Sequence, residues 1–159
     1  MKVLNFGSLN IDMVYSVDHV VRPGETTASA ELSYFCGGKG LNQSVALARA
    51  GAEVCHAGCV GADGSRLISL LRDNGVDTSL VTKSESPSGH AIIQVDRDGQ
   101  NSILLFGGAN MEITPEQIEN AVGNFSAGGR LFLQNEINDI SEIIGAAHER
   151  EMEIVFNPS

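Results

Sequence analysis

The stretch Cys36-Gly37-Gly38-Lys39-Gly40-Leu41-Asn42 is the most informative part of the chain, because three glycines stand directly before a helical segment. Helix-forming residues over 41–50, followed by Gly51, predict a helix that opens just after this turn. Glycines let the backbone approach a ligand closely, and a helix start directs free amides and a positive dipole end towards it. The stretch is therefore a candidate oxygen- or anion-binding turn. Its spacing fits neither a Walker loop nor G-x-G-x-x-G.

Short apolar segments alternate with helical ones along most of the chain. The segments expected to be buried strands are 2–7, 53–60, 131–133 and 153–156. The helices expected beside them are 66–73, 115–122 and 140–147. Strands that alternate with helices favour an α/β fold with a mainly parallel sheet.

Two regions, within 13–35 and 90–106, break this rhythm. Their patterns are typical of antiparallel strands rather than of strand–helix–strand units. The strands expected there are 13–21, 26–35, 90–96 and 102–106. The last two are joined by Asp96-Arg97-Asp98-Gly99-Gln100, where Asp and Gly supply the dihedral freedom that a hairpin needs. We expect a small, separate antiparallel β-layer beside the α/β body.

Composition and charge narrow the class of partner. The 159 residues are about one domain, and their 10 Lys+Arg against 20 Asp+Glu give a net charge of -10. This charge disfavours nucleic acid as a partner, because phosphates would be repelled. No apolar stretch approaches the roughly 20 residues of a membrane helix, so no membrane partner is expected. The N-terminus does not resemble a signal peptide and three cysteines cannot all pair, so we expect a cytoplasmic protein.

Polar residues follow two of the expected strands. Asn10 and Asp12 come just after the first strand, where open α/β sheets place ligand-binding groups. On an extended segment their spacing points both side chains to one side, so they could bind neighbouring hydroxyls of one polyol or, alternatively, cap loop amides. Glu136 follows the strand at 131–133 and could accept sugar hydroxyls or be an ordinary loop residue. Cysteines and histidines form no spacing typical of a zinc site or a nucleophile pair, so no metal site is expected.

Three motifs occur in an order and spacing that resemble the N-terminal half of the ribokinase-like carbohydrate kinases. They are Gly7-Ser8-Leu9-Asn10-Ile11-Asp12, Pro23-Gly24-Glu25-Thr26 and Gly37-Gly38-Lys39-Gly40-Leu41-Asn42-Gln43. The resemblance continues through Gly107-Gly108-Ala109-Asn110 and Gln134-Asn135-Glu136 and covers essentially the whole chain. It implies that 1–159 is the N-terminal portion of a three-layer αβα domain, with the antiparallel strands as a lid over the sugar. The C-terminal nucleotide-binding portion would be absent.

The resemblance also implies a reaction and a set of sugar contacts. The reaction is ATP-dependent phosphorylation of a primary hydroxyl, here of a pentose such as ribose, and it uses Mg²⁺. The implied sugar-binding residues are Asn10, Asp12, Gly38, Lys39, Gly40, Leu41, Asn42 and Glu136. The family's catalytic aspartate follows a Gly-Ala-Gly turn, and this turn and the family's Asn-x-x-Glu motif have no counterpart here. We therefore expect no catalytic residue in this chain, no turnover by it alone, and ATP and Mg²⁺ only for the complete kinase.

Two further expectations concern partners and alternatives. A half-apolar sheet that projects from the body would leave a face wet unless a ligand or second chain covered it, so we expect a homodimer through the β lid, as the resemblance also implies. The alternatives are a stand-alone sugar-binding or dimerisation module, or a kinase for fructose or a nucleoside. The strand at 153–156 contains no Lys or Pro that would protect an exposed edge, which favours a fragment over a module.

Overall fold

A five-stranded parallel sheet forms the centre of the molecule in a computed structural model that describes residues 2–158. The strand order is β5-β4-β1-β8-β9, and every neighbouring pair is parallel. The bounds are Lys2–Phe6 for β1, Glu53–Val60 for β4, Asp77–Lys83 for β5, Arg130–Gln134 for β8 and Glu153–Asn157 for β9. The central position of β1 explains its apolar run, because both of its faces are covered.

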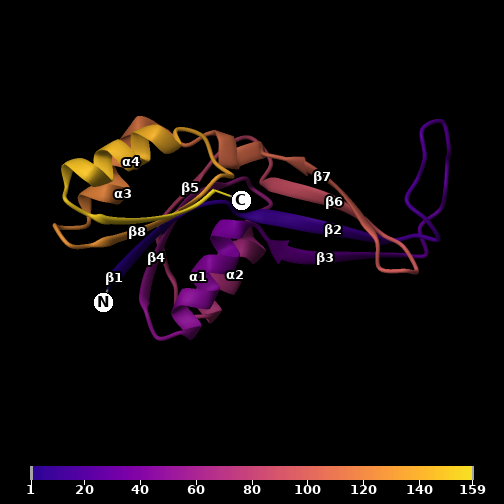
Figure 1. The fold of residues 1–159 in the computed structure, drawn as a ribbon, viewed down its shortest axis with the longest axis horizontal. Helices are drawn as coiled ribbons and strands as arrows, with labels where there is room; N and C mark the ends of the chain where they lie inside the picture. The colour runs from indigo at the N-terminus through magenta and orange to yellow at the C-terminus, as the bar shows by residue number, and fades with distance from the viewer. Residues whose placement is uncertain (1, 159) are drawn as a thin grey trace.

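Helices cover the two faces of this sheet, which gives the expected three layers (Figure 1). Helices α1 (Lys39–Arg49) and α2 (Ser65–Asp73) lie on one face, with a core that includes Leu9, Leu41 and Leu67. Helices α3 (Pro115–Gly123) and α4 (Ile140–Glu149) lie on the other, over a second cluster around Leu4, Phe6 and Leu131. The predicted α/β fold is confirmed. No helix within residues 2–158 is long and apolar enough to cross a membrane.

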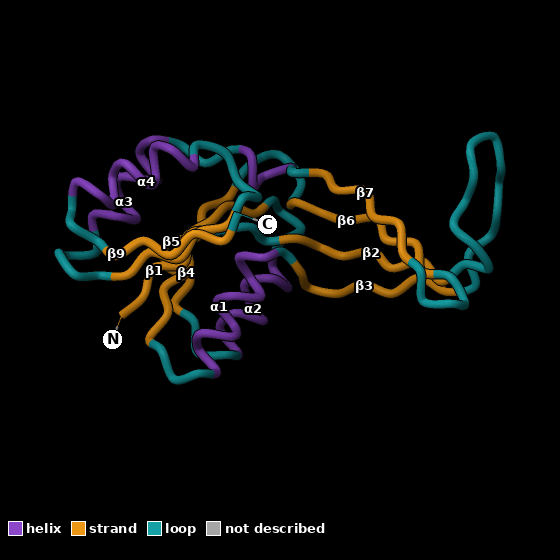
Figure 2. Tube along the Cα trace, in the orientation of Figure 1, coloured by secondary structure: helices purple, strands orange, loops and turns teal. Residues whose placement is uncertain are grey.

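A second sheet, which we call the lid, projects from one end of this body (Figures 1 and 2). Its strand order is β3-β2-β6-β7. The bounds are Asn10–Ser16 for β2, Glu31–Gly37 for β3, Gly89–Val95 for β6 and Asn101–Phe106 for β7. The turn between β6 and β7 forms as predicted, with the Gly99 amide donating to the Asp96 carbonyl at 3.1 Å.

The prediction of a wholly antiparallel lid was wrong for its central pair. The β2–β3 and β6–β7 pairs are antiparallel, but β2 and β6 run parallel. The reason is that each hairpin leaves the body on its first strand and returns on its second. The two outgoing strands are neighbours, so they point the same way.

The lid strands also differ in their bounds from the expected ones. Strand β2 begins at Asn10 and ends at Ser16 rather than spanning 13–21, and β3 begins at Glu31 rather than near 26. Residues 17–30 form a loop that projects from the far end of the lid (Figure 2). A turn within it has the Glu25 amide donating to the Arg22 carbonyl at 3.0 Å. The apolar pattern of the sequence continues beyond Ser16, where β2 ends, so the predicted strand was too long.

Candidate active-site region

The glycine turn before α1 packs directly against the connection between β1 and β2. Gly38 has φ 96, and a Cβ there would lie 2.9 Å from the Ser8 carbonyl oxygen. A Cβ on Gly40 would lie 2.4 Å from the Ser8 nitrogen, which is too close for any side chain. The Leu41 amide donates to the Ser8 carbonyl at 2.9 Å and the Gly40 amide to the Ser8 hydroxyl at 3.2 Å. The glycines are therefore required for the close approach of two backbone segments.

Glu136, in the connection after β8, ties three separate segments together. Its Oε2 accepts hydrogen bonds from the Ser8 hydroxyl at 2.6 Å and from the Lys39 amide at 3.0 Å. Its Oε1 accepts from Lys39 Nζ at 2.6 Å, in a partly exposed ion pair. Burial alone would raise the pKa of Glu136, but the hydrogen bonds from Lys39 and Ser8 outweigh it and lower the pKa below its ordinary value. Glu136 is therefore a carboxylate at neutral pH.

Asn10 and Asp12 lie on one face of the lid, at the start of strand β2. A Cβ built on the neighbouring Gly37 would lie 2.0 Å from Asp12 Oδ2, so the missing side chain makes room for this carboxylate. Burial, and then the negative charge of Glu136, raise the pKa of Asp12 above its ordinary value. The carboxylates of Asp12 and Glu136 thus interact electrostatically at the base of the lid, and the Lys39 ammonium pairs with that of Glu136.

A buried polar network supports the turn from below. Asn5 Nδ2 donates to the Gly40 carbonyl and to Ser44 Oγ, both at 2.7 Å. Ser44 Oγ lies 2.7 Å from His56 Nδ1, and Gln134 Nε2 donates to Asn5 Oδ1 at 2.8 Å. Burial lowers the pKa of His56 to about 4, so the ring is neutral at pH 7. The network joins β1, β4 and β8 to α1 beneath the glycine turn.

The structure thus brings together Asn10, Asp12, Lys39 and Glu136 with the backbone of Gly38 and Gly40. The side chain of Leu41 is 1% exposed and belongs to the core, and its amide is taken by Ser8. Asn42 is exposed in the first turn of α1 and lines a different hollow beside Cys36 and Arg49. Ser8 is a further residue of this group that was not predicted from the sequence, although its place directly after β1 is a signal that could have found it.

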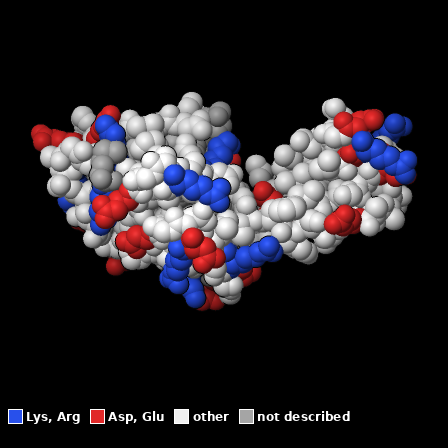
Figure 3. All heavy atoms as spheres, turned by 90° about the horizontal axis from the view of Figure 1, so that it is seen from below, with Lys and Arg blue, Asp and Glu red and all other residues white. Residues whose placement is uncertain are grey.

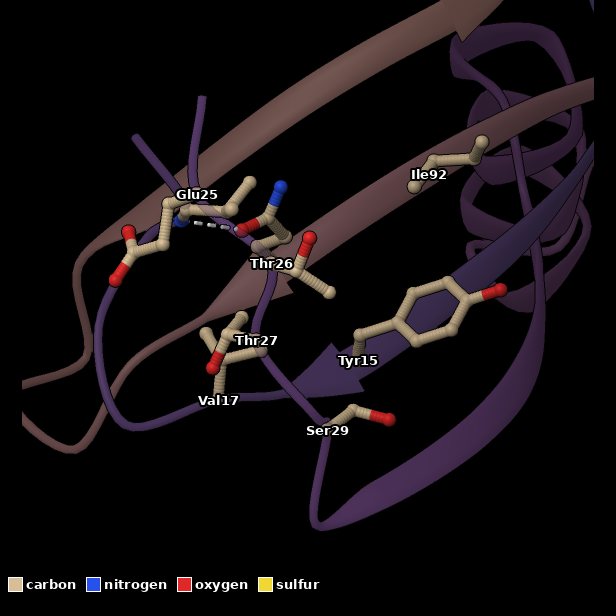
Figure 4. A pocket seen from close by; sticks show the side chains of 9 residues that line it. Tyr15, Val17, Glu25, Thr26, Thr27, Ser29 and Ile92 are labelled. Atoms are coloured by element: carbon tan, nitrogen blue, oxygen red, sulfur yellow. Dashed lines mark hydrogen bonds between the residues drawn. The ribbon is translucent and has the colours of Figure 1, made fainter. Parts of the chain in front are cut away.

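The far end of the lid has a hollow of its own, of about 390 Å³ (Figure 4). It is lined by Tyr15, Ile92 and residues of the 17–30 loop, which is held there by the Val21 amide donating to Gln94 Oε1 at 2.9 Å. Tyr15 is three residues beyond Asp12 on β2, so it lies on the opposite face of the lid. This hollow is therefore separate from the group around Glu136.

Comparison with known proteins identifies the family. The model of the pfkB family carbohydrate kinases matches residues 1–153. This chain belongs to that family. It is 35% identical to the ribokinase of Bacillus subtilis over an alignment 160 residues long, which covers 96% of this chain and 54% of that protein. The chain therefore spans about half the length of the curated relatives that it matches.

Solved structures of family members show the same fold. Ribokinase from Thermotoga maritima matches with a TM-score of 0.85 and 36% identity, over 98% of this chain and 52% of that one. Arabidopsis thaliana ribokinase, solved in complex with ribose and ATP, matches with a TM-score of 0.77 and 26% identity, over 99% of this chain and 53% of that one. The ribokinase-like architecture of residues 2–158 is thereby confirmed.

Proposed function

We propose that this chain is the sugar-binding part of an ATP-dependent carbohydrate kinase that phosphorylates a primary hydroxyl of a pentose such as ribose. The observation that carries the proposal is the meeting of Asp12, Glu136 and the glycine turn at the base of the lid. Two carboxylates and an adjacent amide can hold several hydroxyls of one small molecule. The relatives named as ribokinases support ribose as the leading sugar.

Each site residue has a role in this proposal. Asp12 and Glu136 accept hydrogen bonds from sugar hydroxyls, and Asn10 adds an amide beside Asp12. Lys39 and Ser8 keep Glu136 ionised and fixed in place. Gly38 and Gly40 let the start of α1 lie close to the sugar, whereas Asn42, which lines a different hollow, is given no contact with it in this proposal. Leu41 contributes only by packing this turn onto the core.

The lid covers the sugar and excludes water from it in this proposal. Its strands expose more apolar surface than one pentose can cover, including Phe35, Ile103 and Leu104, which are 54%, 53% and 68% exposed. Seen from below, the middle of the lid carries few charges, while charged side chains gather at its far end (Figure 3). We therefore propose that a second copy of the chain packs on the lid to form a homodimer in the cytoplasm.

ATP and Mg²⁺ belong to the complete kinase in this proposal. Residues 2–158 contain no cluster of three or more His, Cys, Asp and Glu side chains that could hold a metal, so no step is assigned to a metal held by this chain. The general base for the sugar hydroxyl and the nucleotide site are proposed to lie in the half that the relatives have beyond this region. The open edge of β9, where Val155 and Phe156 are each 40% exposed, is where that half would continue the sheet.

Calorimetric titration of the 159-residue chain with ribose tests the sugar site. We expect saturable binding that Asp12→Asn weakens about tenfold, as expected for one altered hydrogen bond to a charged group. Asp98→Asn in the exposed β6–β7 turn is the matched control and should bind ribose like the unchanged chain. Equal binding by both variants would remove Asp12 from the site. Ribose-dependent ATP consumption by the purified chain would contradict the proposed absence of a catalytic base.

A further inference from the structure

Asn110 holds the connection between β1 and β2 at the base of the lid, where the chain returns from β7 to the body. It lies in the short 3-10 helix η1 (Gly108–Met111), just after β7, and is 2% exposed. Its Oδ1 accepts from the Leu9 amide at 2.9 Å. Its Nδ2 donates to Asn10 Oδ1 at 2.7 Å and to the Leu9 carbonyl at 3.4 Å. One side chain therefore makes three bonds to two consecutive residues.

These bonds fix which way the amide of Asn10 faces. The Leu9 N–H can only donate, so it requires the oxygen of Asn110. The nitrogen of Asn110 then faces Asn10, and because two N–H groups cannot bond to each other, Asn10 must turn its own oxygen to it. The Asn10 nitrogen is left over as a donor, and no bond to it is found within residues 2–158.

The fold reserves space for this pair. Gly89 is the register partner of Asn10 in the parallel β2–β6 ladder. A Cβ on Gly89 would lie 2.0 Å from Asn110 Nδ2 and 2.3 Å from Asn10 Oδ1, so any side chain there would displace the two amides. Asn10 itself is 7% exposed, which limits its freedom to find another partner.

We propose that Asn110 is a positioning residue for sugar recognition, which acts by locking Asn10 with its amide N–H towards the sugar. This rests on the proposed function of the site. Asn10 then supplies a donor beside Asp12, a carboxylate that can only accept. A hydroxyl group both accepts and donates, so this pair fits a sugar hydroxyl, or two neighbouring ones, and disfavours a ligand that lacks them.

A double-mutant cycle tests whether Asn110 acts through Asn10. Ribose affinity is measured by calorimetry for the unchanged chain, Asn110→Ala, Asn10→Ala and the double variant. We expect each single variant to bind about tenfold more weakly, and the double variant to bind no more weakly than Asn10→Ala alone. Unchanged affinity in Asn110→Ala, or losses that multiply in the double variant, would overturn the proposal. Asn101→Ala, at the exposed start of β7, is the matched control.

NMR of the chain without ribose tests the bond between Asn110 and Asn10 independently of sugar binding. In the unchanged chain, NMR should show slow exchange of the Asn110 side-chain amide protons and a scalar coupling across the bond to the Asn10 side-chain carbonyl. Gly89→Ala, which forces a Cβ against this pair without replacing either asparagine, should remove both signals. If the unchanged chain fails to bind ribose, the proposed function fails, and these signals then decide the orientation of Asn10. Their absence from the unchanged chain would overturn the proposal, even if Asn110→Ala does not fold.

Discussion

The two sheets of this molecule are built from similarly apolar strands, yet they meet water very differently. In the body, Leu4 and Phe6 of β1 and Leu131 of β8 are 0% exposed. In the lid, every residue of β7 is exposed, including the apolar run 103–106. The body sheet has helices on both faces, whereas no helix covers the outer part of the lid (Figure 1). The exposed apolar residues of β7 therefore contribute little to the stability of the isolated chain, and they are available to contact a partner.

The largest expected effect comes from comparing the free energy of unfolding after one leucine-to-alanine substitution in each sheet. Leu131→Ala creates a cavity in the closed body and should lower the free energy of unfolding by about 3 kcal/mol. Leu104→Ala removes the same atoms from the exposed lid strand and should lower it by less than about 0.5 kcal/mol. Urea denaturation measures both. Similar losses would show that the lid is as well packed as the body, contrary to the exposures.

A second expected effect concerns the joint between body and lid. Gly40→Ala forces a Cβ against the Ser8 backbone and should lower the free energy of unfolding by about 2 kcal/mol, as for other overpacked sites. The matched control is Gly145→Ala in α4, where a Cβ meets nothing within 4 Å and should stabilise the helix by about 0.5 kcal/mol. If both variants are equally stable to urea, the contact of the turn with Ser8 is not tight.

The buried network of the body predicts a pH dependence of the free energy of unfolding. The pKa of His56 is lowered to about 4 by burial, so between about pH 6.5 and pH 4 the unfolded chain binds a proton that the folded chain excludes. Stability therefore falls as the pH is lowered through this window, by about 2 kcal/mol between pH 7 and pH 5.

The measurement is the free energy of unfolding at pH 5 and pH 7 for the unchanged chain and for His56→Asn. The variant should lose most of this pH dependence, even if it is less stable overall. His148→Asn, on the exposed side of α4, is the control and should keep it. The same slope in His56→Asn as in the unchanged chain would place the titration elsewhere.

The smallest expected effect on folding is a substitution in the lid that changes association instead. Leu104→Asp should leave the free energy of unfolding of the monomer within about 0.5 kcal/mol, because the side chain is already in water. In sedimentation velocity it should convert the proposed dimer to monomer, because a charge would be buried in the contact. Asn120→Asp, which adds the same charge on the exposed side of α3 in the body, is the control. A monomeric unchanged chain would contradict the proposed homodimer.

The body could be predicted from the sequence because its signals are local. The start of α3 is predicted by three residues within four positions, Thr114, Pro115 and Gln117. The structure shows the Gln117 amide donating to Thr114 Oγ1 at 3.2 Å. Strand β5 was missed, because Asp77, Ser79 and Thr82 give it little apolar character and only alternate positions are buried. Edge strands of this kind carry a weak pattern.

The lid and the inner part of the site could be predicted less fully, because they depend on segments far apart in the chain. The register of Asn10 with Gly89 depends on how the elements between them, including β4 and β5, pack in the body. The residues adjacent to Asn10 or Gly89 in the sequence carry no signal for this pairing. Asn10, Asp12 and Glu136 could be selected because each follows a strand. Ser8 carries the same signal, although its bond to Glu136 could not be foreseen, and Asn110 could not be placed at all, since its partners are set only when separate connections meet.

The parallel pairing of β2 with β6 has a consequence for how the chain folds. The chain crosses between body and lid four times, and α1, β4, α2 and β5 all lie between the two hairpins in sequence. The pairing of β6 with β2 therefore closes a loop that contains all of those elements, and closing so long a loop carries an entropic cost. We therefore expect the four-stranded sheet to assemble late and to open early, so its amides should exchange with solvent before those of the body.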